Sequence, residues 1–142
     1  MKGIFKPFLM AATVAGLFFV SSCTKTCDPG YEGSDCKTEV RAKFLANNKV
    51  TTDNCAGAGY NLSITADSDV ETIVFSNLGN FSTPAVVKAQ VSDTSFSFTS
   101  FVDATGRKFT GTGTLTGNTI NLTYTVVYTD NTSESCTVSI AL

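Results

Sequence analysis

The residues best able to do chemistry in this chain of 142 residues are its five cysteines. They stand at positions Cys23, Cys27, Cys36, Cys55 and Cys136. The sequence contains no histidine, so imidazole metal ligands and histidine-based nucleophilic catalysis are excluded. Because five is an odd number, at least one cysteine must stay outside any set of internal disulfides.

The alternative to disulfides is a metal site built from the cysteine thiolates. Structural zinc sites draw their ligands in pairs that lie two to four residues apart, and the four downstream cysteines show no such spacing. We therefore expect no metal, and the sequence shows no motif for any other cofactor.

The carboxylates at Asp67, Asp69 and Glu71 alternate along the chain, as at the start of a calcium loop. The glycine and the late glutamate that such a loop requires do not follow, so this segment is predicted to be a charged hairpin tip. No two acids are placed to face each other across a cleft, as glycoside hydrolysis would need. We expect no enzyme.

The first 22 residues have the organisation of an export signal. Lys2 and Lys6 precede an uncharged apolar run over residues 8–20, which is too short to span a bilayer as a helix. Residues 20–23 read Val-Ser-Ser-Cys, and the whole segment resembles a bacterial lipoprotein signal. The resemblance implies cleavage after residue 22 and lipid on Cys23, with an ordinary secretory peptide as the alternative.

The predicted location follows from the same resemblance. Thr24 after the lipidated cysteine, rather than an aspartate, implies the outer membrane, with the protein facing the periplasm or the cell surface. The net charge is -2, and removing two lysines with the signal makes it more negative. Nucleic acid is therefore not an expected partner, since its phosphates bind basic protein surfaces.

The segment Cys27–Cys36 reads CDPGYEGSDC and resembles the last cysteine loop of an EGF-like module. Without Cys23, four cysteines allow three pairings, and an exported protein meets an oxidising compartment. The resemblance implies that Cys27 pairs with Cys36, which leaves Cys55 to pair with Cys136. Residues 23–37 are then a lipid anchor followed by a stapled spacer.

From residue 48 onward the chain is rich in Thr, Ser, Val and Phe, with turn residues every 8 to 12 positions, which is typical of an all-β domain. Over residues 38–46 we expect one short helix capped by Thr38, with Val40, Phe44 and Leu45 on one face. The predicted strands are 48–55, 59–66, 70–77, 84–91, 95–102, 107–116, 119–129 and 134–142.

The turn at Gly117–Asn118 allows the pairing of one hairpin to be predicted. It sets Leu115 opposite Ile120 and makes one face apolar and the other almost entirely hydroxyl. The same reasoning predicts three further pairs, which are Val126 with Cys136, Ile64 with Ile73, and Val91 with Phe96. For the first of them, a three-residue loop at 130–132 is needed to keep the apolar faces together.

Eight sequential strands with neighbour pairing indicate an antiparallel up-and-down meander over residues 38–142. A bridge between Cys55 and Cys136 would tie the first strand to the last, which favours a barrel or a curled sheet; a β-sandwich is the alternative. With the Thr38–Leu45 motif TEVRAKFL, the chain resembles small bacterial outer-membrane lipoproteins that carry an EGF-like loop and a lipocalin-like meander. That resemblance implies no particular activity.

Three functions remain open at this point. The first is a non-catalytic, lipid-anchored module of the cell envelope that binds a protein or a glycan. The second is a lipocalin-like carrier of a small apolar ligand, and the third is an inhibitor of a lysozyme or a protease. A carrier needs interior space, which Gly111 and Gly113 could leave and aromatic rings could fill. The residues expected to line such a pocket are Phe96, Phe98, Phe109 and Tyr124.

Overall fold

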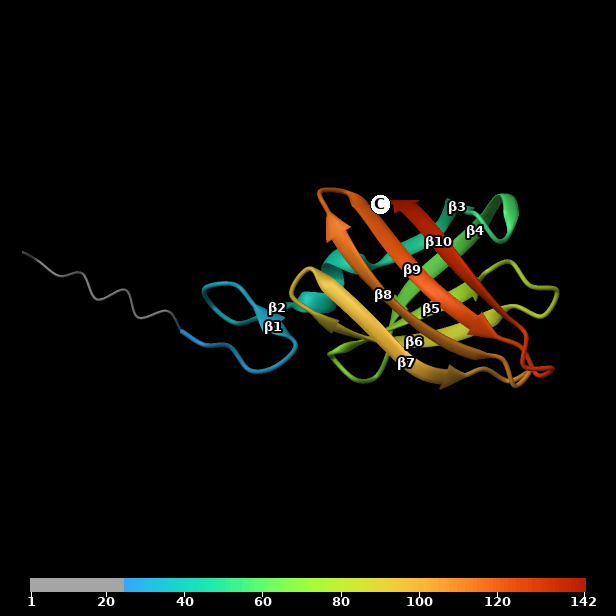
Figure 1. The fold of residues 1–142 in the computed structure, drawn as a ribbon. Coiled ribbons are helices and arrows are strands. Elements are labelled where there is room, and N and C mark those ends of the chain that lie inside the picture. Colours follow the sequence, from blue (N-terminus) through green and yellow to red (C-terminus); the bar gives the residue numbers. More distant parts are fainter. Residues whose placement is uncertain (1–24) are drawn as a thin grey trace, which may run out of the picture.

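The computed structural model describes residues 25–142 as an all-β protein (Figure 1). Eight antiparallel strands close into a barrel in the order β10-β3-β4-β5-β6-β7-β8-β9. The predicted meander is therefore confirmed as a closed barrel rather than a sandwich. The elements are β1 (Tyr31–Glu32), β2 (Thr38–Glu39), the 3-10 turn η1 (Val40–Phe44), β3 (Ala46–Asp53), β4 (Gly57–Ala66), β5 (Thr72–Leu78), β6 (Ala85–Ser92), β7 (Ser95–Val102), β8 (Lys108–Thr116), β9 (Thr119–Val127) and β10 (Ser133–Ala141).

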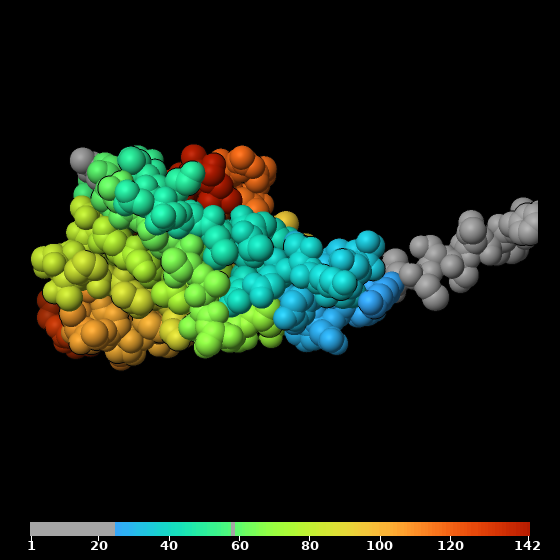
Figure 2. Space-filling model, turned by 180° about the vertical axis from the view of Figure 1, so that it is seen from behind, coloured from blue at the N-terminus to red at the C-terminus, as the bar shows by residue number. Residues whose placement is uncertain are grey.

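A second, two-stranded sheet lies outside the barrel. It consists of β1 and β2, and a disulfide joins Cys27 to Cys36 in the loop that carries them. This loop projects from one end of the barrel, blue to cyan in Figure 2. The segment proposed as a signal, and Cys23, lie outside the described residues. Within residues 25–142, no helix has the length and apolar character needed to cross a membrane.

The interior of the barrel is built by strict alternation. In β6 and β8, for example, every second residue is buried and the intervening residues are exposed. This is the period of two that a strand imposes when one face packs on a core and the other meets water. The fully buried apolar side chains of the described residues come from these inward positions and from η1, where Phe44 is fully buried, and loop side chains such as Phe81 pack against them.

Two glycines of β8 are matched to aromatic rings of β7. Phe98 is the cross-strand partner of Gly111, and Phe96 is the partner of Gly113. A Cβ at Gly111 would lie 2.6 Å from the Phe98 ring, and one at Gly113 would collide with Phe96. The rings lie over the glycine backbone, an arrangement that compensates for the missing side chain of a glycine in a strand.

The predicted pairs nearest to the two-residue turns are right, whereas the predicted pair of Ala89 with Phe98 is wrong, because the register of β6 and β7 ends at Gln90–Ser97. Leu115 faces Ile120 across the Gly117–Asn118 turn, and Val91 faces Phe96 across Asp93–Thr94. The hydroxyl rows of the β8–β9 hairpin are also present as predicted, with Thr112 opposite Thr123 and Thr114 opposite Asn121.

Two other hairpins pair two residues away from the prediction. Cys136 faces Tyr124 rather than Val126, and Ile73 faces Ala66 rather than Ile64. Each connection is longer than expected because an aspartate side chain binds main-chain N–H groups in the loop: Asp130 accepts from Thr132 and Asp69 accepts from Glu71. A shift of two leaves every side chain on its predicted face.

The expected helix over residues 38–46 is wrong. Thr38 belongs to β2 and caps nothing, since Glu39 precedes η1 without any side-chain cap. Val40 and Phe44 are buried as predicted, but Leu45 is exposed. The segment is shortened from both sides because Glu39 pairs with Tyr31 in the small sheet and β3 already begins at Ala46.

Candidate functional site

The barrel is closed where β3 meets β10, and this junction gathers most of the polar groups buried in the wall. Only three residue pairs join the two strands, from Val138 with Asp53 to Ile140 with Thr51. Beyond them, a disulfide joins Cys55 to Cys136 with an S–S distance of 2.09 Å, as the sequence predicted. We call this junction the closing seam.

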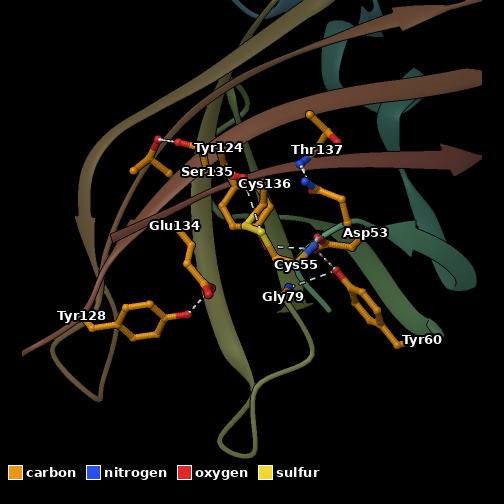
Figure 3. Close-up of a disulfide and its surroundings, with 12 residues drawn as sticks. Asp53, Cys55, Tyr60, Gly79, Tyr124, Tyr128, Glu134, Ser135, Cys136 and Thr137 are labelled. Atoms are coloured by element: carbon orange, nitrogen blue, oxygen red, sulfur yellow. Dashed lines mark hydrogen bonds between the residues drawn. A yellow bond between two sulfur atoms is a disulfide. The ribbon is translucent and has the colours of Figure 1, made fainter. Parts of the chain in front are cut away.

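A buried carboxylate lies beside that disulfide (Figure 3). Asp53 is 2% exposed, and its Oδ2 accepts hydrogen bonds from Tyr124 Oη at 2.8 Å and from Tyr60 Oη at 3.1 Å. Its Oδ1 accepts from the Cys55 N–H at 2.9 Å, and the Tyr60 oxygen accepts from the Gly79 N–H at 3.0 Å. Every oxygen of the cluster therefore has a partner, as a buried polar group requires.

The two tyrosines of this cluster remain protonated at any physiological pH. Burial raises the pKa of Tyr60 and of Tyr124 well above the usual value, and the adjacent Asp53 raises both further. They act as fixed hydrogen-bond donors to the carboxylate. The cluster therefore has the properties of a structural network and lacks the mobile proton that acid–base catalysis needs.

Neither Asp53 nor Tyr60 was predicted as a site residue from the sequence. The partners come from different strands, and Tyr124 is 71 positions from Asp53 in the chain. One feature of the sequence could have indicated Asp53. It lies two residues before Cys55, at the end of the first barrel strand, which the predicted disulfide links to the last strand.

Asp53, Cys55 and Cys136 also form a candidate metal cluster. Their potential ligand atoms lie within 4.8 Å of one another. Both sulfurs are joined in the disulfide, so neither offers the thiolate that a soft metal binds. In this form the cluster has a single anionic ligand.

The four residues predicted to line an interior pocket are all buried in the core. Phe96, Phe98, Phe109 and Tyr124 are at most 4% exposed. The rings of Phe96 and Phe98 pack against Phe75, with centroids 5.1 Å and 6.3 Å away, and those of Phe109 and Tyr124 pack against each other at 6.3 Å. Such distances are those of packed aromatic pairs.

Side chains also cover the end of the barrel opposite the stapled loop. The guanidinium of Arg107 lies 4.1 Å above the Phe81 ring and donates a hydrogen bond of 2.8 Å to the Thr83 carbonyl. Its Nε donates to Asp103 Oδ2 at 2.8 Å. Burial alone would raise the pKa of Asp103, but the hydrogen bonds from Arg107 and Thr105 outweigh it and hold that pKa below its usual value.

A hollow of about 770 Å³ lies on the outside of the barrel wall, across β8, β9, β10 and β3. We call it the hydroxyl groove. Its outward side chains are uncharged hydroxyls and amides in cross-strand rows, such as Thr112–Thr123–Thr137. Among the described residues, Asp53 is the one charged residue that lines it, and its carboxylate is already bound by the tyrosines. The outward polar groups are Thr52, Asn54, Thr112, Thr114, Asn121, Thr123, Thr137 and Ser139.

The alternating acids at Asp67, Asp69 and Glu71 lie at the β4–β5 connection, as predicted for a hairpin tip. Asp67 forms an ion pair of 2.6 Å with Lys88 of β6. Asp69 is bound within its own loop, where it accepts from the Thr72 hydroxyl at 2.9 Å. Asp67 and Asp69, but not Glu71, line a second hollow on the outer wall, which is described below.

No family model matches this chain, and comparison with curated proteins and with solved structures finds no match either. What the protein does must therefore be inferred from its own residues and their geometry.

Proposed function

We propose that this protein is a non-catalytic binding module, held at the bacterial outer membrane by lipid on Cys23, and that its ligand is a glycan bound in the hydroxyl groove. The observation that carries the proposal is the contrast between the two faces of the wall. The inner face is filled by aromatic rings packed over glycines, whereas the outer face carries the larger hollow.

The chemistry of the groove favours an uncharged, hydroxyl-rich ligand. Threonine, serine and asparagine side chains both donate and accept hydrogen bonds, which matches the alternating donor and acceptor capacity of sugar hydroxyls. A strongly charged ligand would find no counter-charge there, because Asp53 is buried and already bound by Tyr60 and Tyr124. The absence of an aromatic side chain in the lining implies recognition by hydrogen bonds rather than by ring stacking.

The EGF-like loop serves in this proposal as a rigid spacer between lipid and barrel. The Val40 N–H donates to the Gly30 carbonyl at 2.9 Å, and Lys43 forms an ion pair of 2.6 Å with Glu32. Gly30 lies so close to Val70 that an added Cβ would be 2.7 Å from it. The loop is thus attached to the barrel by contacts with η1 and with the β4–β5 connection, which supports a fixed orientation.

Glycan-array binding by residues 24–142 tests the proposal, because that segment holds every element of the structure. Thr123→Val removes one groove hydroxyl with little change in shape and is expected to weaken binding about three- to tenfold, the worth of one neutral hydrogen bond. Thr116→Val, on the same hairpin and outside the groove, is the matched control. Equal behaviour of the two variants, or no glycan bound at all, would reject the groove as the site.

Two further measurements separate this proposal from the other hypotheses. Metabolic labelling with an alkyne-tagged fatty acid should mark the wild-type chain and not Cys23→Ala, and equal labelling would reject the anchor. Uptake of an apolar fluorescent probe into the wild type, lost on Gly113→Phe, would favour the carrier instead.

A further inference from the structure

The second feature of the outer wall is a place where two neighbouring strands separate. β6 and β7 are joined only near their turn, by the pairs Ser92–Ser95, Val91–Phe96 and Gln90–Ser97. β6 runs back to Ala85 and β7 runs on to Val102, and over these stretches no register pair joins them within the described residues. We call this region the β6–β7 gap.

The two sides of the gap remain held by their other neighbours. β6 pairs with β5 from Ala85 to Gln90, and β7 pairs with β8 up to Val102. Ser100 has a φ of 51° and its N–H donates to the Thr110 hydroxyl, which marks a bulge where β7 bends. The edge of β7 is therefore interrupted, whereas β6 alternates regularly along its whole length.

A hollow of about 480 Å³ opens at the point where the register ends. Lys88, Gln90, Thr99 and Phe101 line it from the two strands, and Asp67 and Asp69 line it from the β4–β5 connection. Lys88 forms an ion pair with Asp67, whereas the carboxylate of Asp69 is bound by the Glu71 N–H and the Thr72 hydroxyl. The Arg41 guanidinium donates to the main-chain carbonyls of Asp67 and Asp69 and attracts the Asp69 carboxylate, but it is already paired with Glu39. Acidic side chains therefore outnumber basic ones at this connection.

The far end of the gap is apolar and faces water. Val86 of β6 is 49% exposed and Val102 of β7 is 52% exposed. On β6 the outward residues follow each other as Gln90, Lys88 and Val86, at about 7 Å per step. A ligand lying along this edge meets the carboxylates first and the valines next.

We propose that the β6–β7 gap binds an extended segment of a partner protein, which adds as a strand to the free edge of β6. The segment carries a basic side chain at the position that faces Asp69 and apolar side chains that lie against Val86 and Val102. Main-chain hydrogen bonds supply affinity in such strand addition, and alternate side chains supply specificity. The site is separate from the hydroxyl groove and does not depend on the glycan proposal.

A second copy of this chain is a poorer occupant of the same edge. Antiparallel pairing of two β6 edges about Lys88 would set the two ammonium groups opposite each other, and like charges in that position are destabilising. Lysines and bulges at a sheet edge are the usual protection against self-pairing. Here the bulge lies on β7 and the lysine on β6.

The test uses residues 24–142 and a short synthetic peptide of alternating valine and threonine with one central lysine. Binding is followed by the backbone amide signals of residues 85–89 in a two-dimensional NMR spectrum. Titration is expected to shift these signals selectively. The same peptide with N-methyl groups along one edge should bind at least about tenfold more weakly, because it cannot form the ladder.

Matched variants separate this site from the groove. Asp69→Asn should weaken the lysine peptide and leave a glutamine version of the peptide unchanged, while Thr123→Val should affect neither. The proposal is overturned if no amide of residues 85–89 responds at about 1 mM peptide, if N-methylation has no effect, or if Thr123→Val abolishes binding. The proposal is also overturned if the free protein dimerises with increasing concentration and the amide signals of residues 85–89 shift as it does so, because the occupant of the edge would then be a second copy of this chain.

Discussion

The closing seam and the junction of β6 with β7 are equally short in strand pairing, since each has only three register pairs. The closing seam is reinforced by a disulfide, by a hydrogen bond of 2.6 Å from the Thr137 N–H to Asn54 Oδ1, and by the Asp53 cluster. The β6–β7 gap has no comparable reinforcement among the described residues.

The difference follows from the distance along the chain. Cys55 and Cys136 are 81 residues apart, so bringing β3 to β10 costs the entropy of closing a long loop. β6 and β7 are joined by the two-residue turn Asp93–Thr94, which keeps their near ends together without further contacts. In this barrel a covalent link therefore supports the junction where the sheet closes, whereas the β6–β7 hairpin can open along its length and leave an edge free.

Loss of the closing disulfide should have the largest effect on stability. The double variant Cys55→Ala, Cys136→Ala is expected to lower the free energy of unfolding by about 4 kcal/mol, from the loop-closure entropy of the unfolded chain. Urea denaturation measures it. Replacing Cys27 and Cys36 in the same way should change the barrel transition by less than about 1 kcal/mol, because that disulfide lies outside the barrel. Similar losses for both pairs would contradict the comparison.

Gly113→Ala should come next, because it tests the ring contact that holds β7 against β8. The added methyl group meets the Phe96 ring, and overpacking of this kind costs about 2–3 kcal/mol. Denaturant unfolding gives the loss, and adding Phe96→Leu should restore part of it. A loss below about 0.5 kcal/mol would show that the ring contact does not hold β7 against β8.

Tyr124→Phe is expected to cost about 1–2 kcal/mol at neutral pH, since Asp53 loses a donor and stays buried. Folded Tyr60 and Tyr124 have raised pKa values, so their stabilising effect is complete below pH 10 and declines as the pH rises above it. Stability should then fall by about 1.4 kcal/mol per pH unit for each buried tyrosine.

Unfolding free energies measured between pH 8 and about pH 11 check this, and the slope should be shallower in Tyr124→Phe. Val86→Thr, at the other junction, should keep the wild-type slope. An unchanged slope in Tyr124→Phe would mean that the alkaline sensitivity does not arise at the closing seam.

The smallest effect is expected at the gap itself. Val86→Thr and Val102→Thr remove exposed apolar groups and should change the free energy of unfolding by less than about 0.5 kcal/mol. Both should nevertheless weaken binding of the valine-rich peptide. A large loss of stability would show that these valines pack in the free protein and that the edge is not open.

Much of the fold could be predicted because it is determined by residues close together in the sequence. The two-residue turns at Gly117–Asn118 and Asp93–Thr94 fix which residues face each other, and alternation then fixes the two faces. The longer connections could not be placed, because Asp69 and Asp130 use their side chains to extend the loops beyond the residues that turn chemistry marks.

The candidate sites were less visible than the strands. The hydroxyl rows of β8 and β9 were predicted from the sequence, but the groove also needs Thr137 and Ser139 of β10 in the correct register, and that register was misplaced by two residues. No local sequence pattern predicts the β6–β7 gap. We relate the separation of the strands to the bulge at Ser100 and to the packing of β7 rings over the glycines of β8, and neither is marked by turn residues.

The stapled loop also limits how far this protein can reach. Only residues 24–26 separate the proposed lipid-bearing Cys23 from Cys27, so the fully extended chain between these two cysteines spans about 14 Å. The loop is fixed to the barrel through Gly30 and Glu32, so the barrel cannot swing outward to lengthen that distance. On this anchor, both outer-wall sites stay within roughly one barrel length of the bilayer. Their ligands must come to the membrane surface to be bound.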